Sequence, residues 1–230
     1  MDRRGPHGPV ARAHAPVTPM HAEVMPPAQQ GLLRRLGPLA ARRGFYLGGG
    51  TAVAIHLGHR RSVDLDWFTG EPLTEPLRLA AALREAGVPV AVEAVEAGTL
   101  HGEADGVRLS FLEYRYPLVH PPVEWAPFGC SLASLEDLAC MKLSAVAGRG
   151  ARKDFLDLYA LGRRHLSLPR MLDLYQRKFQ TADVGHVLFS LTYFDDAEVE
   201  AMPEMLWDLD WQDVRRTIEG WVREYAGGAS

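Results

Sequence analysis

The segment from Phe45 to Phe68 constrains the fold more than any other part of this chain. Phe45-Tyr46-Leu47 is typical of a short buried strand, and three glycines, 48–50, end it. Residues 51–57 can wind directly into a helix, and residues 63–68 have the apolar pattern of a second strand. A strand, a glycine turn, a helix and another strand in so short a span predict a mixed α/β core.

Asp64 and Asp66 stand two residues apart in the second of these strands. Alternate residues of a strand face the same side, so both carboxylates point one way while Val63, Leu65 and Trp67 point the other. Two such carboxylates repel unless a cation lies between them, and Mg²⁺ prefers carboxylate and phosphate oxygens. Asp-x-Asp alone is common in surface strands, but the apolar flanks favour a strand inside a sheet, where unpartnered acids are rare.

The glycine run is a second, independent candidate element. Glycines between a strand and a helix allow backbone N–H groups to approach a phosphate closely, and Thr51 adds a hydroxyl at the helix entry. The lysine of a Walker A loop and the spacing of a dinucleotide fingerprint are both missing. Taken alone, the run is equally compatible with a tight turn that has only a structural role.

The rest of the chain divides into three regions. Six prolines lie in residues 1–29, which predicts a flexible tail. Residues 30–128 are expected to form the α/β lobe, with further strands near 88–95, 99–103 and 107–114. Residues 129–230 are expected to be helical, and Ser134-Leu-Glu-Asp137 resembles a capping box that opens the first of these helices.

Charge is distributed unevenly along the chain, although the formal net charge is only −4. Residues 31–70 hold six arginines and two acids, and residues 142–178 hold nine basic residues and three acids, for net charges of +4 and +6. Both segments carry the candidate motifs, and a site for a triphosphate and a nucleic acid favours this potential. Solvation of exposed helix faces would explain some of these charges equally well.

The segment 181–213 has the opposite charge, with nine acids and no Lys or Arg. It could be an interaction surface, a cover for the basic site or a solvated face. The two cysteines have no metal-binding spacing, no signal peptide is supported and no run is long enough to span a membrane, so we expect a cytoplasmic protein.

The motifs together resemble a known pattern. Gly-Gly, a short helix and then Asp-x-Asp on a strand is similar to the DNA polymerase β-like nucleotidyltransferase superfamily. More narrowly, YLGGGTAVAIHLGHRRSVDLDWF and, at residues 134–161, SLEDLACMKLSAVAGRGARKDFLDLYAL resemble the AbiEii/AbiGii toxin family. The resemblance spans about residues 32–165. It implies an α+β fold, with a mixed sheet, flanking helices and a helical C-terminal lobe that completes the active site.

The resemblance also implies roles for single residues. Asp64 and Asp66 would bind Mg²⁺, with Mn²⁺ as the alternative ion. Lys142 would pair with the triphosphate, and Asp154 would assist the metal or position a base. The residues expected to contact the nucleotide are Gly49, Gly50, Thr51, Arg60, Ser62, Arg149 and Lys153.

The chain departs from the superfamily pattern at one position. A third carboxylate is expected on a later strand, but residues 107–114 place Ser110 there, and Glu113 falls on the opposite strand face. Either Asp154 supplies the third acid or the site uses two. A nearby acid, Asp157, is interpreted as a partner of Lys153.

The resemblance implies a metal-dependent transfer of a nucleoside monophosphate from a nucleoside triphosphate (NTP). RNA, at the 3′ end of transfer RNA (tRNA), is the expected acceptor, and the chain is expected to be the toxin of a bacterial toxin–antitoxin pair with an antitoxin as partner. Two alternatives remain: an enzyme acting on a protein or a small molecule, and a binding partner whose catalytic capacity is vestigial.

Overall fold

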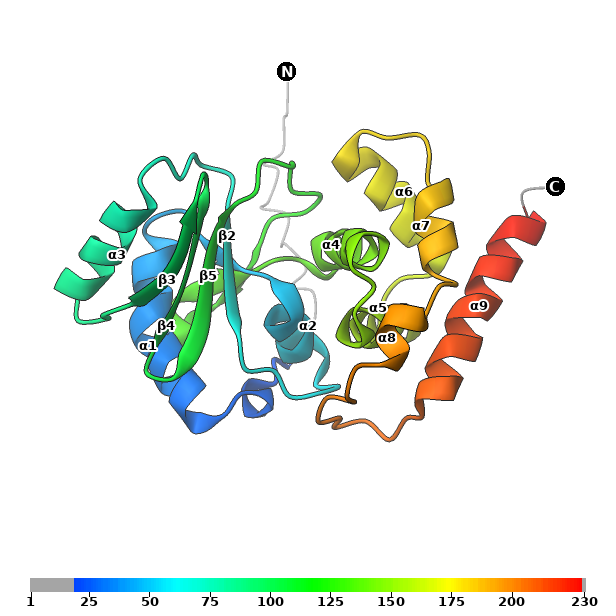
Figure 1. Ribbon diagram of the computed structural model, residues 1–230, viewed down its shortest axis with the longest axis horizontal. Coiled ribbons are helices and arrows are strands. Elements are labelled where there is room, and N and C mark those ends of the chain that lie inside the picture. Colours follow the sequence, from blue (N-terminus) through cyan, green and yellow to red (C-terminus); the bar gives the residue numbers. More distant parts are fainter. Residues whose placement is uncertain (1–18, 229–230) are drawn as a thin grey trace, which may run out of the picture.

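Seven strands pair into one mixed sheet in a computed structural model that describes residues 19–228 (Figure 1). The strands are β1 (Tyr46–Leu47), β2 (Leu65–Thr69), β3 (Ala91–Glu96), β4 (Thr99–Ala104), β5 (Val107–Glu113), β6 (Val123–Trp125) and β7 (Cys130–Leu132), in the order β3-β4-β5-β2-β1-β7-β6. β2 runs parallel to β5 and antiparallel to β1. The strand that carries Asp66 is therefore central in the sheet.

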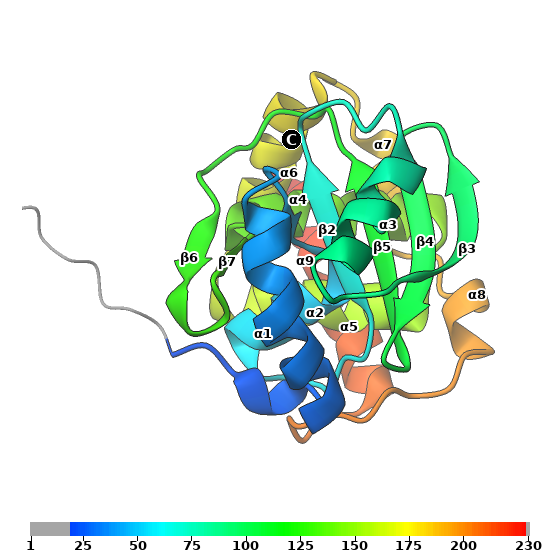
Figure 2. The ribbon, with the colours of Figure 1, turned by 90° about the vertical axis from the view of Figure 1, so that its left-hand side faces the viewer.

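Helices cover both faces of this sheet. α1 (Pro27–Ala41) and α3 (Pro76–Glu85) lie on its outer face, towards the viewer in Figure 2. α2 (Gly49–Leu57) lies on the other face and also contacts α4 and α5 of the C-terminal half. α2 is buried along most of its length because its side chains are small and apolar, so it can pack between the sheet and the helices.

The C-terminal half consists of helices. They are α4 (Leu135–Gly148), α5 (Arg152–Arg164), α6 (Leu168–Phe179), α7 (Gly185–Ser190), α8 (Asp195–Glu198) and α9 (Trp211–Gly228), and we call them the helical lobe. The Ser134 side chain accepts a hydrogen bond from the backbone N–H of Asp137 at 3.0 Å, which confirms a side-chain cap at the start of α4. None of the helices between residues 19 and 228 has the length and apolar character needed to cross a membrane.

The structure differs from the predicted boundaries at the N-terminus. A short 3₁₀ helix covers Ala22–Val24, and Val24 and Met25 are buried in the core. Pro27 begins α1, where a missing N–H costs nothing, so the prolines here start a helix rather than prevent one. The expected tail is therefore wrong for residues 19–29, and residues 1–18 lie outside the described residues.

Three other boundaries shift by a few residues. α2 begins at Gly49, so the second and third glycines open the helix. β2 begins at Leu65, which leaves Asp64 just before the strand. β7 follows residue 128 but pairs with β1, so the sheet extends beyond the boundary expected for the α/β lobe.

Candidate active site

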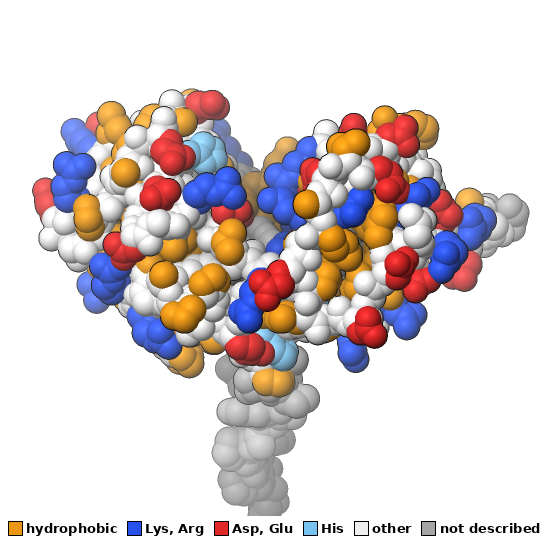
Figure 3. All heavy atoms as spheres, turned by 60° about the horizontal axis from the view of Figure 1, so that its bottom comes forward, with side chains coloured by type: hydrophobic (Ala, Val, Ile, Leu, Met, Phe, Trp, Pro, Cys, Tyr) orange, Lys and Arg blue, Asp and Glu red, His pale blue; other side chains and the backbone are white. Residues whose placement is uncertain are grey.

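A cavity of about 780 Å³ lies between the sheet and the helical lobe. In Figure 3 the surface is hollowed between the two halves of the molecule, and Lys and Arg side chains gather on both sides of the hollow. Ten of the predicted site residues line the cavity: Gly49, Gly50, Thr51, Arg60, Ser62, Asp64, Asp66, Lys142, Arg149 and Lys153. Asp154 is not among the lining residues. The sheet thus contributes the carboxylates and the helical lobe contributes lysines and an arginine.

The glycine turn packs directly against the acidic motif. Gly49 has φ +63°, a conformation that favours glycine, and a Cβ atom there would collide with Oδ2 of Asp66. A Cβ atom at Gly50 would collide with the guanidinium of Arg60. Gly49 and Gly50 are the first residues of α2, where backbone N–H groups have no partner within the helix. The turn therefore brings N–H donors close to Asp66 in the lining of the cavity.

Two hydroxyl groups hold the backbone of the acidic motif in place. Thr51 Oγ1 lies 2.6 Å from Ser62 Oγ and donates to the backbone carbonyl of Asp64. Gln29 Nε2 donates to the same carbonyl at 3.1 Å. Thr51 and Ser62 are both buried although both line the cavity. The Thr51 hydroxyl thus fixes the backbone of Asp64, and Ser62 holds that hydroxyl in place.

Asp64 and Asp66 have different surroundings. Arg108 donates to both carboxylate oxygens of Asp64, with its Nε 3.0 Å from Oδ1. Asp66 forms no ion pair with a Lys or Arg of the described part of the chain. Burial raises the pKa of Asp66, the Asp64 charge raises it further, and the Ser110 hydroxyl opposes the shift. Within residues 19–228, Asp66 is thus a carboxylate that no Lys or Arg pairs with directly.

The donor set fits a divalent cation that is shared with a nucleotide. Within residues 19–228, no group of three or more His, Cys, Asp or Glu side chains could hold a metal by itself. At sites that also bind phosphates, Mg²⁺ is commonly held by one or two carboxylates together with phosphate oxygens and water. Asp64 and Asp66 would hold the ion from the protein side, and the nucleotide would complete its shell.

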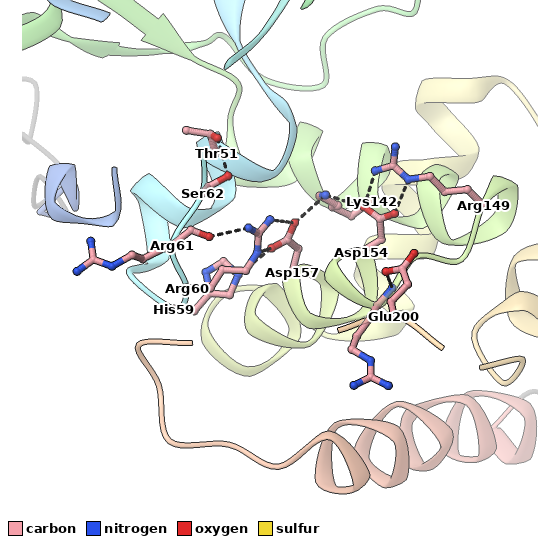
Figure 4. A network of polar contacts seen from close by, with 11 residues as sticks. Thr51, His59, Arg60, Arg61, Ser62, Lys142, Arg149, Asp154, Asp157 and Glu200 are labelled. Atoms are coloured by element: carbon pink, nitrogen blue, oxygen red, sulfur yellow. Dashed lines mark hydrogen bonds and ion pairs between the residues drawn. The ribbon is translucent and has the colours of Figure 1, made fainter. Parts of the chain in front are cut away.

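A buried network of charges lies behind the cavity wall (Figure 4). Asp157 has no exposed surface, and it accepts hydrogen bonds from His59 Nε2 at 2.8 Å and from Arg60 Nε and Nη2 at 2.7 and 2.9 Å. Lys142 Nζ lies 2.7 Å from Oδ2 of Asp157. Burial opposes ionisation, but the charges of Arg60 and Lys142 hold the pKa of Asp157 well below its usual range. The expected pairing of Asp157 with Lys153 is therefore wrong.

Asp154 belongs to the same network. Its carboxylate accepts hydrogen bonds from Lys142 Nζ at 2.8 Å and from Arg149 Nε at 2.7 Å, and Arg149 Nη2 adds a third at 2.9 Å. Lys142 is 4% exposed and joins Asp154 to Asp157. Lys142 lines the cavity, but two aspartates compensate the charge of its ammonium group.

Strand β5, which pairs with β2, has no carboxylate at the position beside Asp66. Ser110 of β5 pairs in register with Asp66, and His101 of β4 places its Nδ1 3.1 Å from Ser110 Oγ. Both residues line the cavity. Glu113 accepts a hydrogen bond from the backbone of Leu73 and is not a cavity residue, as the strand alternation predicts.

Two features of the site were not predicted from the sequence. Arg108 is two residues before Ser110 on the same strand face, so strand alternation is the signal that could identify it. Asp157 is a candidate in the sequence, but its true partners are remote along the chain: Arg60 is 97 residues away. A local sequence pattern cannot predict such a contact.

The chain is similar to a known protein family and to a known protein over most of its length. The family model for the "Nucleotidyl transferase AbiEii toxin, Type IV TA system" matches residues 31–224. An uncharacterized protein of Aquifex aeolicus (strain VF5) is 35% identical over 200 residues, which cover 86% of this chain and 95% of that protein.

Solved structures are similar in fold at low sequence identity. MenT4, a nucleotidyltransferase toxin of Mycobacterium tuberculosis H37Rv, has a TM-score of 0.56 and 16% identity over 86% of this chain and 82% of its own. A structure from H. pylori has a TM-score of 0.52 and 15% identity over 85% of this chain and 92% of its own. These neighbours confirm the α+β, polymerase β-like fold, and the family match covers both lobes. The chain belongs to the AbiEii family of nucleotidyltransferase toxins of type IV toxin–antitoxin systems.

Proposed function

We propose that this enzyme transfers a nucleoside monophosphate from an NTP to the 3′ end of tRNA in the cytoplasm, in a reaction that requires Mg²⁺. The observation that carries the proposal is the contact between the glycine turn and Asp66 inside a cavity of about 780 Å³. The N–H groups at the start of α2, which would bind phosphate, meet there with Asp66, which has no Lys or Arg ion-pair partner among the described residues. An antitoxin protein would be its partner.

The chain's own residues would bind and orient the triphosphate. The N–H groups of Gly49 and Gly50 would donate to phosphate oxygens, supported by the positive end of α2. Lys153 and Arg149 are exposed on the opposite wall and would contact the departing pyrophosphate. Asp154 would act indirectly, because it is buried and holds Lys142 and Arg149 in place.

The reaction would be an in-line displacement. The acceptor oxygen would form the new bond to the α-phosphorus and release its hydroxyl proton to water. The bond between the α-phosphorus and the oxygen that bridges to the β-phosphorus would break, and pyrophosphate would leave with that oxygen. When bound, Mg²⁺, or Mn²⁺ as the alternative, would neutralise the charge that develops on the phosphate oxygens. Asp64 and Asp66 would hold the ion, and the basic cavity wall would stabilise the leaving group.

The basic residues around the cavity support a polyanionic acceptor. Arg61, Arg108, Arg149 and Lys153 line the cavity together and all carry exposed or partly exposed side chains. Binding of RNA through such residues should weaken steeply as salt is added. A small-molecule or protein acceptor, the alternative activity, would show little dependence on salt.

The direct test is transfer of label from α-³²P NTPs to total cellular RNA with Mg²⁺. Wild type is compared with Asp64→Ala and Asp66→Ala, and Asp173→Ala is the matched control because Asp173 is exposed on α6, outside the cavity. We expect label in a tRNA-sized band that both site variants lose and the control retains.

Other outcomes separate the alternatives. Transfer without RNA would point to a protein or small-molecule acceptor. Triphosphate binding without any transfer to any acceptor would indicate the vestigial binding partner. Equal labelling by wild type and both site variants would contradict the role of the carboxylate pair.

A further inference from the structure

Arg108 forms the one ion pair that reaches the carboxylate pair in the described residues. Its Nε and Nη2 lie 3.0 and 3.3 Å from the two carboxylate oxygens of Asp64. The register between the parallel strands pairs Leu109 with Leu65, so Arg108 and Asp64 precede paired positions on neighbouring strands. The backbone itself therefore sets the two side chains side by side.

The surroundings of Arg108 differ from those of the structural cations. Arg60 and Lys142 are each 4% exposed and bind two or more partners in the buried network. The Arg108 side chain is 67% exposed, and Asp64 is its single acidic partner among the described residues. An exposed pair of this kind contributes little to stability and is easily exchanged. The fold does not need this contact.

The contact occupies the oxygens that a metal would need. A guanidinium that donates to both oxygens of Asp64 leaves them poorly available to a divalent cation, so the two cations compete for one carboxylate. A guanidinium fork matches a phosphate as well as it matches a carboxylate. Arg108 lines the same cavity as Gly49 and Gly50, where the triphosphate would lie.

We propose that Arg108 is the resident counter-ion of Asp64 in the nucleotide-free protein and moves onto a phosphate of the triphosphate when metal and nucleotide bind. This inference rests on the metal site of the proposed function. It makes Arg108 a nucleotide-binding residue and links the two ligands. Free metal binds weakly because it must displace Arg108, and nucleotide binds better with metal because the displaced guanidinium gains a phosphate partner.

The test uses Mn²⁺ as a probe of the full-length protein, with free Mn²⁺ measured by electron paramagnetic resonance. In the absence of nucleotide, we expect Arg108→Ala to bind Mn²⁺ about threefold to fivefold more tightly than wild type. With Mn²⁺ and a non-hydrolysable α,β-methylene NTP, we expect the same variant to bind the analogue about tenfold more weakly. Neither measurement requires turnover.

Arg61→Ala is the matched control. Arg61 also lines the cavity and carries one positive charge, but it pairs with Glu204 rather than with Asp64. Its loss should change Mn²⁺ affinity less than twofold. Equal gains in Mn²⁺ affinity for Arg108→Ala and Arg61→Ala would show a general effect of charge and overturn the counter-ion role.

The remaining outcomes are also decisive. Unchanged binding of the analogue by Arg108→Ala would overturn the transfer of Arg108 to a phosphate. Wild type that binds Mn²⁺ with an affinity equal to that of Arg108→Ala would overturn this inference and leave the proposed metal site intact. Wild type that binds no Mn²⁺ even with the analogue would overturn both.

Discussion

Arg60 and Asp157, which are 97 residues apart in the sequence, form a bidentate ion pair with Nε–Oδ1 and Nη2–Oδ2 distances of 2.7 and 2.9 Å. Arg60 comes from the loop after α2 and Asp157 from α5, so the pair fastens the helical lobe to the α/β lobe directly behind the cavity (Figure 4). Arg60 also lies under Gly50. The geometry of the glycine turn therefore depends on a contact made by the other lobe.

The first prediction concerns the stability of this junction. Asp157→Asn should lower the free energy of unfolding by about 3–5 kcal/mol, because it leaves Arg60 and Lys142 buried with too little negative charge. Urea denaturation followed by circular dichroism measures the change. Asp173→Asn, on the exposed face of α6, is the control and should change stability by less than about 0.5 kcal/mol. A loss below about 1 kcal/mol for Asp157→Asn would contradict the proposed importance of the pair.

The second prediction is a loss of stability in acid. Burial opposes ionisation of Asp157 and Asp154, but neighbouring cations hold the pKa of both below the ordinary value of 3.8. A carboxyl whose pKa is lower in the folded state binds protons more readily when unfolded, so its contribution is complete above pH 3.8 and is lost as pH falls below it. We expect each to remove up to about 1.4 kcal/mol per pH unit in that range.

Unfolding free energies measured from neutral pH down to the acid range test this dependence. Asp157→Asn, where it remains folded, should show a shallower decline than wild type because one of the titrating groups is gone. The same slope in both proteins would mean that Asp157 is already protonated, or unpaired, in the folded state.

The third prediction concerns the glycine turn and activity. Gly49→Ala should reduce nucleotidyl transfer about 100-fold or more, because the new methyl group would displace Asp66 from its position. Gly87→Ala is a control for backbone strain alone, since Gly87 has φ +83° and open space around its Cβ position. Initial rates at saturating NTP distinguish the two. Comparable losses in both variants would indicate strain rather than misplacement of the carboxylate.

The fourth prediction is that Asp66 destabilises the metal-free protein. Burial raises the pKa of Asp66, so keeping its carboxylate ionised costs more free energy in the folded state than in the unfolded state. In the presence of a metal chelator, Asp66→Asn should therefore raise the free energy of unfolding by about 1 kcal/mol. The same substitution should abolish nucleotidyl transfer. Thermal unfolding at neutral pH measures the gain. A less stable variant would show that the carboxylate has a compensating partner.

Local patterns identify much of the candidate site. The strand, the glycine turn and Asp-x-Asp depend on contacts within about twenty residues, and period-2 alternation is a local property. That is why residues 49–51 and the two aspartates can be named from the amino-acid sequence alone. The cap of α4 at Ser134 is predictable for the same reason.

The prolines near the N-terminus show where local patterns mislead. Residues 19–29 have the composition of a tail because prolines prevent most regular structure. Val24 and Met25 are nevertheless buried in the core, and the Val24 carbonyl accepts a hydrogen bond from the Ser62 N–H at 3.2 Å. A segment with few apolar residues is ordered because those few fit one place in the tertiary structure.

By itself, the sequence determined the order of elements from residue 30 to residue 114, the basic character of the segments that meet at the cavity and the choice of Asp64 and Asp66 as the candidate carboxylate pair. Only the tertiary structure decided which charges compensate which. Asp157 pairs with Arg60 and Lys142, Asp154 lies off the cavity wall, and Arg108 binds Asp64. The physical reason is that the energy of a charge depends on burial and on distance in space, and neither follows from spacing along the chain.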